Sequence, residues 1–192
     1  MAITDKKTGV WGLDQTFNKI NQGSIWEYSG SAAAYAWGYN PSGVLGQNNT
    51  TQYSSPVQIP GTTWTQIRIH GNSSPCFGIK SDGTLWAWGD GDDGKRGTGS
   101  PTDNISSPIQ IPGTDWSRVR GHAYGGIATK TDGTLWTWGR NGQGNLGHNN
   151  RTNYSSPKQI PGTWSNNFDI GEYGSMAVNT DGELWGWGAQ AE

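Results

Sequence analysis

The residues best suited to chemistry form one short acidic run, Asp90-Gly91-Asp92-Asp93-Gly94. Alternating carboxylates and glycines offer hard oxygen ligands and a sharp turn, as a calcium-binding loop does. The matching stretches of two neighbouring repeats read Tyr39-Asn40-Pro41-Ser42-Gly43 and Arg140-Asn141-Gly142-Gln143-Gly144, and the full EF-hand spacing is absent. We therefore predict interchangeable turn positions, with no metal and no cofactor.

The other reactive side chains are scattered. His70, His122 and His148 lie at different places and show no zinc-like spacing to one another or to Cys76. Cys76 stands in an apolar run, which predicts a buried, inert thiol. Ser-Ser-Pro and Asp-Gly each recur three times at an interval of about fifty residues, as a requirement of the fold would, whereas a catalytic triad needs unique residues at one place. We predict that the chain is not an enzyme. The catalytic alternative is a hydrolase whose Asp and Glu residues meet in a loop.

Composition narrows the classes of partner. The net charge is −2 with Lys and Arg scattered singly, so no basic patch exists to neutralise phosphates, and we predict no nucleic-acid partner. No run approaches the roughly 18 apolar residues of a membrane span, and the first residues lack the apolar core of a signal peptide. We expect a chain made as a soluble protein, with no membrane insertion. Its 31 glycines and 12 tryptophans favour short strands, tight turns and an aromatic core.

A repeat of about fifty residues organises most of the sequence. Trp-Gly occurs at Trp37, Trp88, Trp138 and Trp187, at spacings of 51, 50 and 49 residues. Further landmarks keep the same phase: Ser-Ser-Pro ends at Pro56, Pro108 and Pro157, Ile-Pro-Gly begins at Ile59, Ile111 and Ile160, and a lone tryptophan follows at Trp64, Trp116 and Trp164. Such a period indicates one supersecondary unit used repeatedly.

Each unit reads as four short antiparallel strands, the pattern of a propeller blade. Asp-Gly at Asp82, Asp132 and Asp181 predicts type I′ hairpin turns, and the proline of the fourth strand suits a sheet edge. Tryptophans two positions apart share one face of a strand, where they can pack on the next blade. The predicted repeat core comprises Trp37, Trp86, Trp88, Trp136, Trp138, Trp185 and Trp187.

The unit Leu-Trp-x-Trp-Gly-x-Asn-x-x-Gly-x-Leu-Gly, seen from Leu135 to Gly147, resembles the repeat of the regulator of chromosome condensation (RCC1) family. The resemblance covers residues 33 to 188 and implies an all-β fold of β-propeller blades, about three and a half in number. The family's founding activities are nucleotide exchange on a small GTPase and docking to chromatin. We do not carry them over, because this chain has too few repeats, no long insertion and no basic tail.

Residues 1 to 30 have no counterpart in the repeats, which occupy residues 31 to 192. They resemble the leader of virion proteins of tailed bacteriophages, in which a Gly-Val-Trp element precedes a variable repeat or fibre region. This resemblance implies an attachment arm, whose residues we take as Val10, Trp11, Leu13, Phe17, Ile20, Ile25 and Trp26. The alternative is an arm packed on its own propeller.

The leading hypothesis is a phage virion structural protein, in a head or tail fibre, a decoration or a receptor contact, made in the host cytoplasm. The alternative is a stand-alone propeller scaffold that binds a protein partner through its loops. A propeller typically has about 4–8 blades, so an open arc of this size predicts a homo-oligomer or an array that covers the exposed faces. The expected partners are other virion proteins, further copies of the chain, and a host receptor or glycan.

Overall fold

The computed structural model describes residues 33–70 and 74–189, all within one compact unit that spans Ala32–Glu192. These residues form thirteen strands and one 3-10 turn, with no α-helix among them. The first sheet pairs β1 (Tyr35–Gly38) with β2 (Tyr53–Gln58). The second contains β3 (Trp64–Arg68), β4 (Pro75–Lys80), β5 (Leu85–Gly89) and β6 (Ile105–Ile111), with the 3-10 turn η1 (Asp92–Gly94) before β6. The third contains β7 (Trp116–His122), β8 (Gly125–Lys130), β9 (Leu135–Gly139) and β10 (Tyr154–Ile160). The fourth contains β11 (Trp164–Ile170), β12 (Gly174–Asn179) and β13 (Leu184–Gly188).

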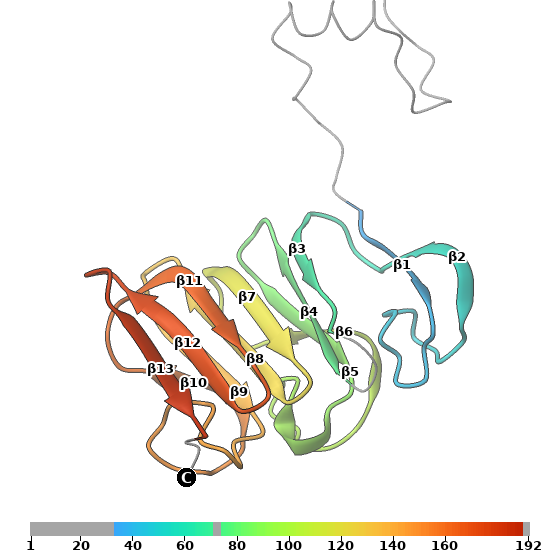
Figure 1. Cartoon of the computed structure of the whole chain (residues 1–192). Helices are drawn as coiled ribbons and strands as arrows, with labels where there is room; N and C mark the ends of the chain where they lie inside the picture. The colour runs from blue at the N-terminus through green and yellow to red at the C-terminus, as the bar shows by residue number, and fades with distance from the viewer. Residues whose placement is uncertain (1–32, 71–73, 190–192) are drawn as a thin grey trace, which may run out of the picture. The chain divides into compact units, whose positions relative to one another are not determined.

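The two complete sheets are four-stranded antiparallel meanders in chain order, and Figure 1 shows the sheets from β3 to β13 following one another side by side. This confirms the all-β architecture of propeller blades. Pro108 and Pro157 lie in β6 and β10, at an edge of their sheets, where the missing N–H costs no ladder bond. Each complete blade therefore begins at a tryptophan and ends on a proline-bearing edge strand.

The Asp-Gly hairpins differ from the predicted type I′ turns. The Gly83 N–H donates to the Lys80 carbonyl over 3.0 Å, and the Asp82 carboxylate accepts from the Thr84 N–H over 3.0 Å. Gly83 has a φ of +76°, whereas Asp82 is not among the described residues with positive φ. A type I′ turn needs positive φ at both central residues, so the hairpin is instead a longer turn closed by one left-handed glycine.

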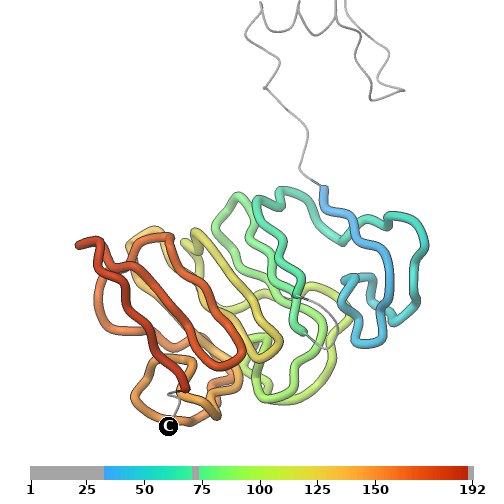
Figure 2. Tube along the Cα trace, in the orientation of Figure 1, coloured from blue at the N-terminus to red at the C-terminus, as the bar shows by residue number. Residues whose placement is uncertain are grey.

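Main-chain hydrogen bonds join each complete blade to the next. The Trp116 N–H, at the start of β7, donates to the Gly83 carbonyl over 3.0 Å, and the Trp164 N–H donates to the Gly133 carbonyl over 2.8 Å. The hairpin tip of one sheet thus fixes where the first strand of the next sheet begins. Figure 2 follows the trace through these joints.

The core lies between successive sheets in three apolar clusters. One contains Phe77 and Leu85 of the second sheet together with Val119 and Trp138 of the third, all fully buried. Another joins Ile127 of the third sheet to the fourth. This arrangement is expected of blades that cannot bury both faces alone. Within the described residues, no helix is long and apolar enough to cross a membrane.

Candidate ligand-binding pocket

A tryptophan in each of the last three sheets anchors the loop of the sheet before it. The indole N–H groups of Trp88, Trp138 and Trp187 donate to the carbonyls of Val44, Lys95 and Asn145 over 2.8, 3.1 and 3.0 Å, respectively. In each loop a glycine with positive φ passes close to the indole, as Gly97 does at Trp138. The loops between the third and fourth strands are thereby held at one end of the blade stack.

The acidic run of the second sheet is part of such a loop. Asp90 pairs with Lys95 over 3.1 Å, and its other oxygen accepts from the Asp92 N–H. Asp93 turns toward the third sheet, where it accepts from Asn153 over 3.2 Å and lies 3.9 Å from Arg140. The carboxylates of Asp90 and Asp93 face separate cationic or amide partners rather than one shared point. Among the described residues no group of three His, Cys, Asp or Glu side chains could hold a metal ion.

Among the described residues, this loop of the second sheet lacks a hydrogen bond that holds the matching loops of the first and third sheets. In the first and third sheets, Asn40 and Asn141 are fully buried and accept the N–H of Leu45 and Leu146. The second sheet has Gly91 and Arg96 at these two positions, and the Arg96 guanidinium lies where a side chain of residue 91 would begin. Burial lowers the pKa of Arg96, while Asp103 and Asp90 oppose that change.

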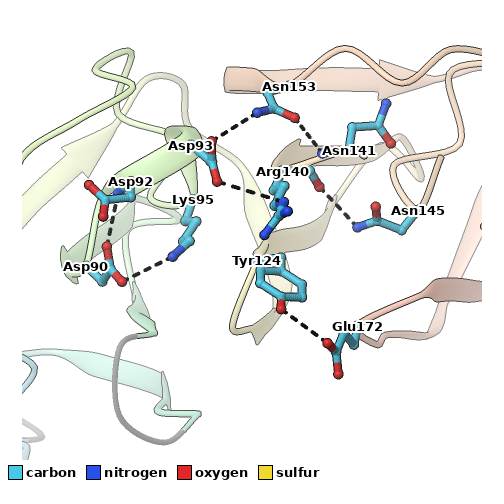
Figure 3. Close-up of polar contacts among 10 residues, drawn as sticks. All are labelled: Asp90, Asp92, Asp93, Lys95, Tyr124, Arg140, Asn141, Asn145, Asn153 and Glu172. Atoms are coloured by element: carbon cyan, nitrogen blue, oxygen red, sulfur yellow. Dashed lines mark hydrogen bonds and ion pairs between the residues drawn. The ribbon is translucent and has the colours of Figure 1, made fainter. Parts of the chain in front are cut away.

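A pocket of about 200 Å³ opens between the loop ends of the third and fourth sheets. Tyr124 comes from the turn between β7 and β8, Arg140 from the loop after β9, and Glu172 from the turn between β11 and β12 (Figure 3). The lining is completed by Gly142, Gln143, Asn145 and Tyr173. The pocket is therefore assembled from three loops of two blades.

Glycines bring the pocket's backbone segments together. The Arg140 N–H donates to the Tyr124 carbonyl over 2.8 Å, next to Gly139, whose φ is +110°. A Cβ on Gly139 would collide with that same carbonyl. Only a glycine at the end of β9 lets Arg140 and Tyr124 share this main-chain bond.

The polar side chains of the pocket form a chain of contacts. The Tyr124 hydroxyl donates to Glu172 over 3.2 Å, and the Arg140 guanidinium lies 5.1 Å from the centre of the Tyr124 ring. Arg140 also faces Asp93. A hydrogen bond to Glu172, together with its negative charge, raises the pKa of Tyr173. The pocket thus holds one carboxylate, one guanidinium and two phenols in reach of solvent.

Three of these pocket residues, Tyr124, Arg140 and Glu172, break the repeat, whereas Tyr173 stands at the repeat position of Tyr124. At the preceding junction, Ser74 occupies the position of Tyr124, and Asp90 occupies that of Arg140. Ala123 there takes the place of Glu172. Sequence reasoning missed Tyr124, Arg140, Glu172 and Tyr173 as site residues. The available signal was the interruption of the repeat at the first three positions, since Tyr173 repeats Tyr124.

The fourth sheet also presents an apolar face. Leu184 is 68 % exposed, whereas the matching Leu85 and Leu135 are fully buried by the next sheet. Met176 and Trp185 are exposed beside it. Together with neighbouring residues of β12 and β13 they line an open groove of about 600 Å³.

The predicted core tryptophans fall into two groups. Trp88 and Trp138 are fully buried, and Trp86, Trp136 and Trp187 are half-buried. Trp37 and Trp185 are more than half exposed, because no described sheet covers them. Within a blade, the paired indoles contact the first tryptophan of their own sheet, as Trp86 and Trp88 contact Trp64. The predicted arm residues Val10, Trp11, Leu13, Phe17, Ile20, Ile25 and Trp26 lie outside the described residues.

Two sequence comparisons give related results. The family model described as "Regulator of chromosome condensation (RCC1) repeat" matches residues 32–76 and 132–177. The E3 ubiquitin-protein ligase HERC2 of Homo sapiens is 32 % identical over 74 residues, which cover 36 % of this chain and 2 % of HERC2; the Mus musculus protein matches equally. The chain therefore spans only a small part of these relatives.

Solved structures share the fold at low identity. Human WBSCR16 superposes with a TM-score of 0.69 at 19 % identity, over 82 % of this chain and 43 % of that chain. Yeast RCC1 (Prp20) in its complex with Kap60 gives 0.68 at 17 % identity, over 82 % and 40 %. The chain spans about two-fifths of each propeller.

Proposed function

We propose that this chain, which carries repeats of the RCC1 family, acts as a binding and display module and not as an enzyme. The pocket formed by Tyr124, Arg140, Glu172 and Tyr173 supports this role. Arg140 and Glu172 have no counterpart at the preceding junction, whereas side chains required only by the fold would recur in every blade. A rigid stack of sheets that presents loops at one end is a common arrangement for a binding site. No catalytic step is assigned to these residues.

The proposed setting is the virion of a tailed bacteriophage, with residues 1 to 30 as the attachment arm and the blades as the displayed body. Support comes from the Gly9-Val10-Trp11 element, which resembles phage virion leaders. The protein would be made in the host cytoplasm and carried in the particle as part of a fibre, a decoration or a receptor contact. Mass spectrometry of gradient-purified particles tests this, and we expect peptides of the chain at the abundance of a structural protein. Their absence would overturn the virion role.

The second candidate is a stand-alone scaffold that binds a protein partner through its loops. Its support is that the yeast protein of similar fold, RCC1 (Prp20), has been solved bound to Kap60, and that Prp20p has binding properties to Gsp1p and histones. Under this alternative the chain stays in the soluble fraction of infected cells with a protein bound at stoichiometric amount. Affinity purification from that fraction, run beside the particle analysis, separates the two candidates.

Self-association is part of the proposal. The groove beside Met176, Leu184 and Trp185 is apolar and open, and an exposed patch of this kind favours association. In the two complete blades a fourth strand pairs with the third one. Within the described residues no strand pairs with the outer edge of β13, the third strand of the fourth sheet. Further copies of the chain, arranged in an oligomer or an array on the particle, would cover this groove and the β13 edge.

A further inference from the structure

We infer that the pocket between the third and fourth sheets binds one neutral sugar residue of a glycan. The inference rests on the proposed role as a binding module and names the ligand of its pocket. At about 200 Å³ the space is smaller than the roughly 300–1,000 Å³ of sites for drug-sized ligands. It can therefore enclose a single ring, with the rest of the ligand extending into solvent.

The walls suit a ring that is apolar on its faces and polar at its rim. Tyr173 is 58 % exposed at the mouth, and Tyr124 forms an inner wall. A phenol combines a flat apolar surface with a hydroxyl, so it can pack against the C–H groups on one face of a sugar and still bond to a hydroxyl. The two tyrosines come from neighbouring sheets and border the same space.

The charged groups supply complementary hydrogen bonds. The Glu172 carboxylate accepts the Tyr124 hydroxyl over 3.2 Å, and a carboxylate has about four acceptor sites, so it can accept further donors. The Arg140 Nε lies 3.9 Å from the Asp93 carboxylate, and the guanidinium carries further N–H donors. Adjacent sugar hydroxyls donate and accept at once, so they can use both groups together. The Gln143 amide adds another donor and acceptor at the rim.

The same charges disfavour other ligands. A cationic side chain would meet Arg140, whose guanidinium already lies over the Tyr124 ring. An anion at Arg140 would be repelled by Glu172 and Asp93. A purely apolar ligand would remove water from a carboxylate and a guanidinium without replacing its hydrogen bonds. A neutral, hydroxyl-rich ring avoids all three penalties.

Saturation-transfer NMR on the full chain tests the inference. The neutral probes are methyl α-glucopyranoside, methyl β-galactopyranoside and the methyl β-glycoside of N-acetylglucosamine, with N-acetylneuraminic acid and N-acetyl-lysine amide as the anionic and cationic probes. We expect transfer to at least one neutral sugar, with a dissociation constant on the order of 1 mM because a single small ring makes few contacts. Transfer only to a charged probe, or to no probe, would overturn the inference.

Matched variants locate the binding. We expect Tyr173→Ala and Glu172→Gln each to weaken sugar binding at least tenfold while leaving the melting temperature close to that of the parent. Tyr39→Ala is the control, because Tyr39 is a similarly exposed tyrosine directly after β1 and does not line the pocket. Equal loss of binding in Tyr39→Ala, or none in either pocket variant, would refute the site. If the chain is found in particles but binds no sugar, only this inference fails. If the chain binds sugar but is absent from particles, only the virion role fails.

Discussion

The indole nitrogen of Trp138 donates a 3.1 Å hydrogen bond to the carbonyl oxygen of Lys95, which belongs to the loop of the preceding sheet. Trp138 is fully buried and its ring meets Phe77 edge-on, with the ring centroids 5.5 Å apart. One side chain therefore joins two blades through a polar contact and an aromatic one. Replacing Trp138 should therefore destabilise the packing between the second and third sheets.

Trp138→Ala should lower the free energy of unfolding by about 3–5 kcal/mol, the usual cost of emptying a buried aromatic site. Trp185 has the same residue type in the same strand motif but is 53 % exposed, so Trp185→Ala should cost well under half as much. Urea denaturation followed by tryptophan fluorescence measures both. Equal losses would mean that burial at the joint does not govern stability.

Gly83→Ala should destabilise the fold more than Gly182→Ala. Both glycines close the same hairpin and have positive φ, which costs a non-glycine residue about 1–2 kcal/mol. A Cβ on Gly83 would also lie 3.1 Å from the backbone nitrogen of Asp115, whereas a Cβ on Gly182 has open space. We expect a lower melting temperature for both variants and a larger drop for Gly83→Ala. A larger drop for Gly182→Ala would argue against the close approach between the second and third sheets.

Burial raises the pKa of the Cys76 thiol to about 12, and its Sγ donates to the Val44 carbonyl over 3.3 Å. In the unfolded chain the pKa of a thiol is about 8.5. Between these two values the unfolded state holds fewer protons than the folded state, so the free energy of unfolding should fall as pH rises from about 8.5 toward 12. Below that range this thiol should have no such effect.

Comparison with Cys76→Ala isolates the thiol from tyrosines and lysines that titrate in the same range. The parent should lose up to about 1.4 kcal/mol more per pH unit than the variant above pH ~8.5. A thiol reagent added at pH 8 should label Cys76 only in denaturant. Rapid labelling of the native protein would contradict the buried site.

Leu184→Asp should weaken self-association without unfolding the blades. Leu184 is exposed on β13, so a charge there costs little in the single chain but would be expensive once the face is covered. Multi-angle light scattering should give a mass above that of one chain for the parent and a lower mass for the variant. A parent that is a stable monomer and binds no hydrophobic dye would refute the proposed self-association.

Deletion of residues 1 to 30 should leave the blades folded and abolish incorporation into particles, if those residues are the attachment arm. The predicted boundary between residues 30 and 31 is tested at the same time. Circular dichroism checks folding, and complementation of a phage lacking the gene checks incorporation. A truncated chain that still enters particles would remove the arm from the proposal.

The strands were predictable because their signals are local. Trp116 opens β7 and Pro157 lies in the edge strand β10, as their repeat positions indicate. The start of β2 was harder to predict than these positions. The strand begins at Tyr53, three residues before the repeat landmark Pro56, because Tyr53 pairs with Gly38 across the sheet. Pairing with a distant strand, rather than local residue type, sets that boundary.

The candidate site could not be assembled from the sequence. Tyr124 and Glu172 are separated by 48 residues and meet only because two hairpin ends of adjacent sheets come together. The exposure of Trp185 was equally hidden, since its motif matches that of the half-buried Trp136. Repetition in sequence predicts equal local structure, but burial depends on the sheet that lies alongside.

The pairing of Gly91 with Arg96 constrains how this chain can evolve. A side chain at residue 91 would collide with the Asp103 carbonyl oxygen and begin 2.5 Å from the Arg96 guanidinium, so the asparagine found in the sister blades could return only with changes at both places. The converse change, Arg96→Leu, would leave a hole beside a glycine and Asp90 without a cationic neighbour. The loop also carries one residue more than its counterparts. Its differences are mutually dependent, so recombination between blades would preserve a working loop only by exchanging the whole segment in one event.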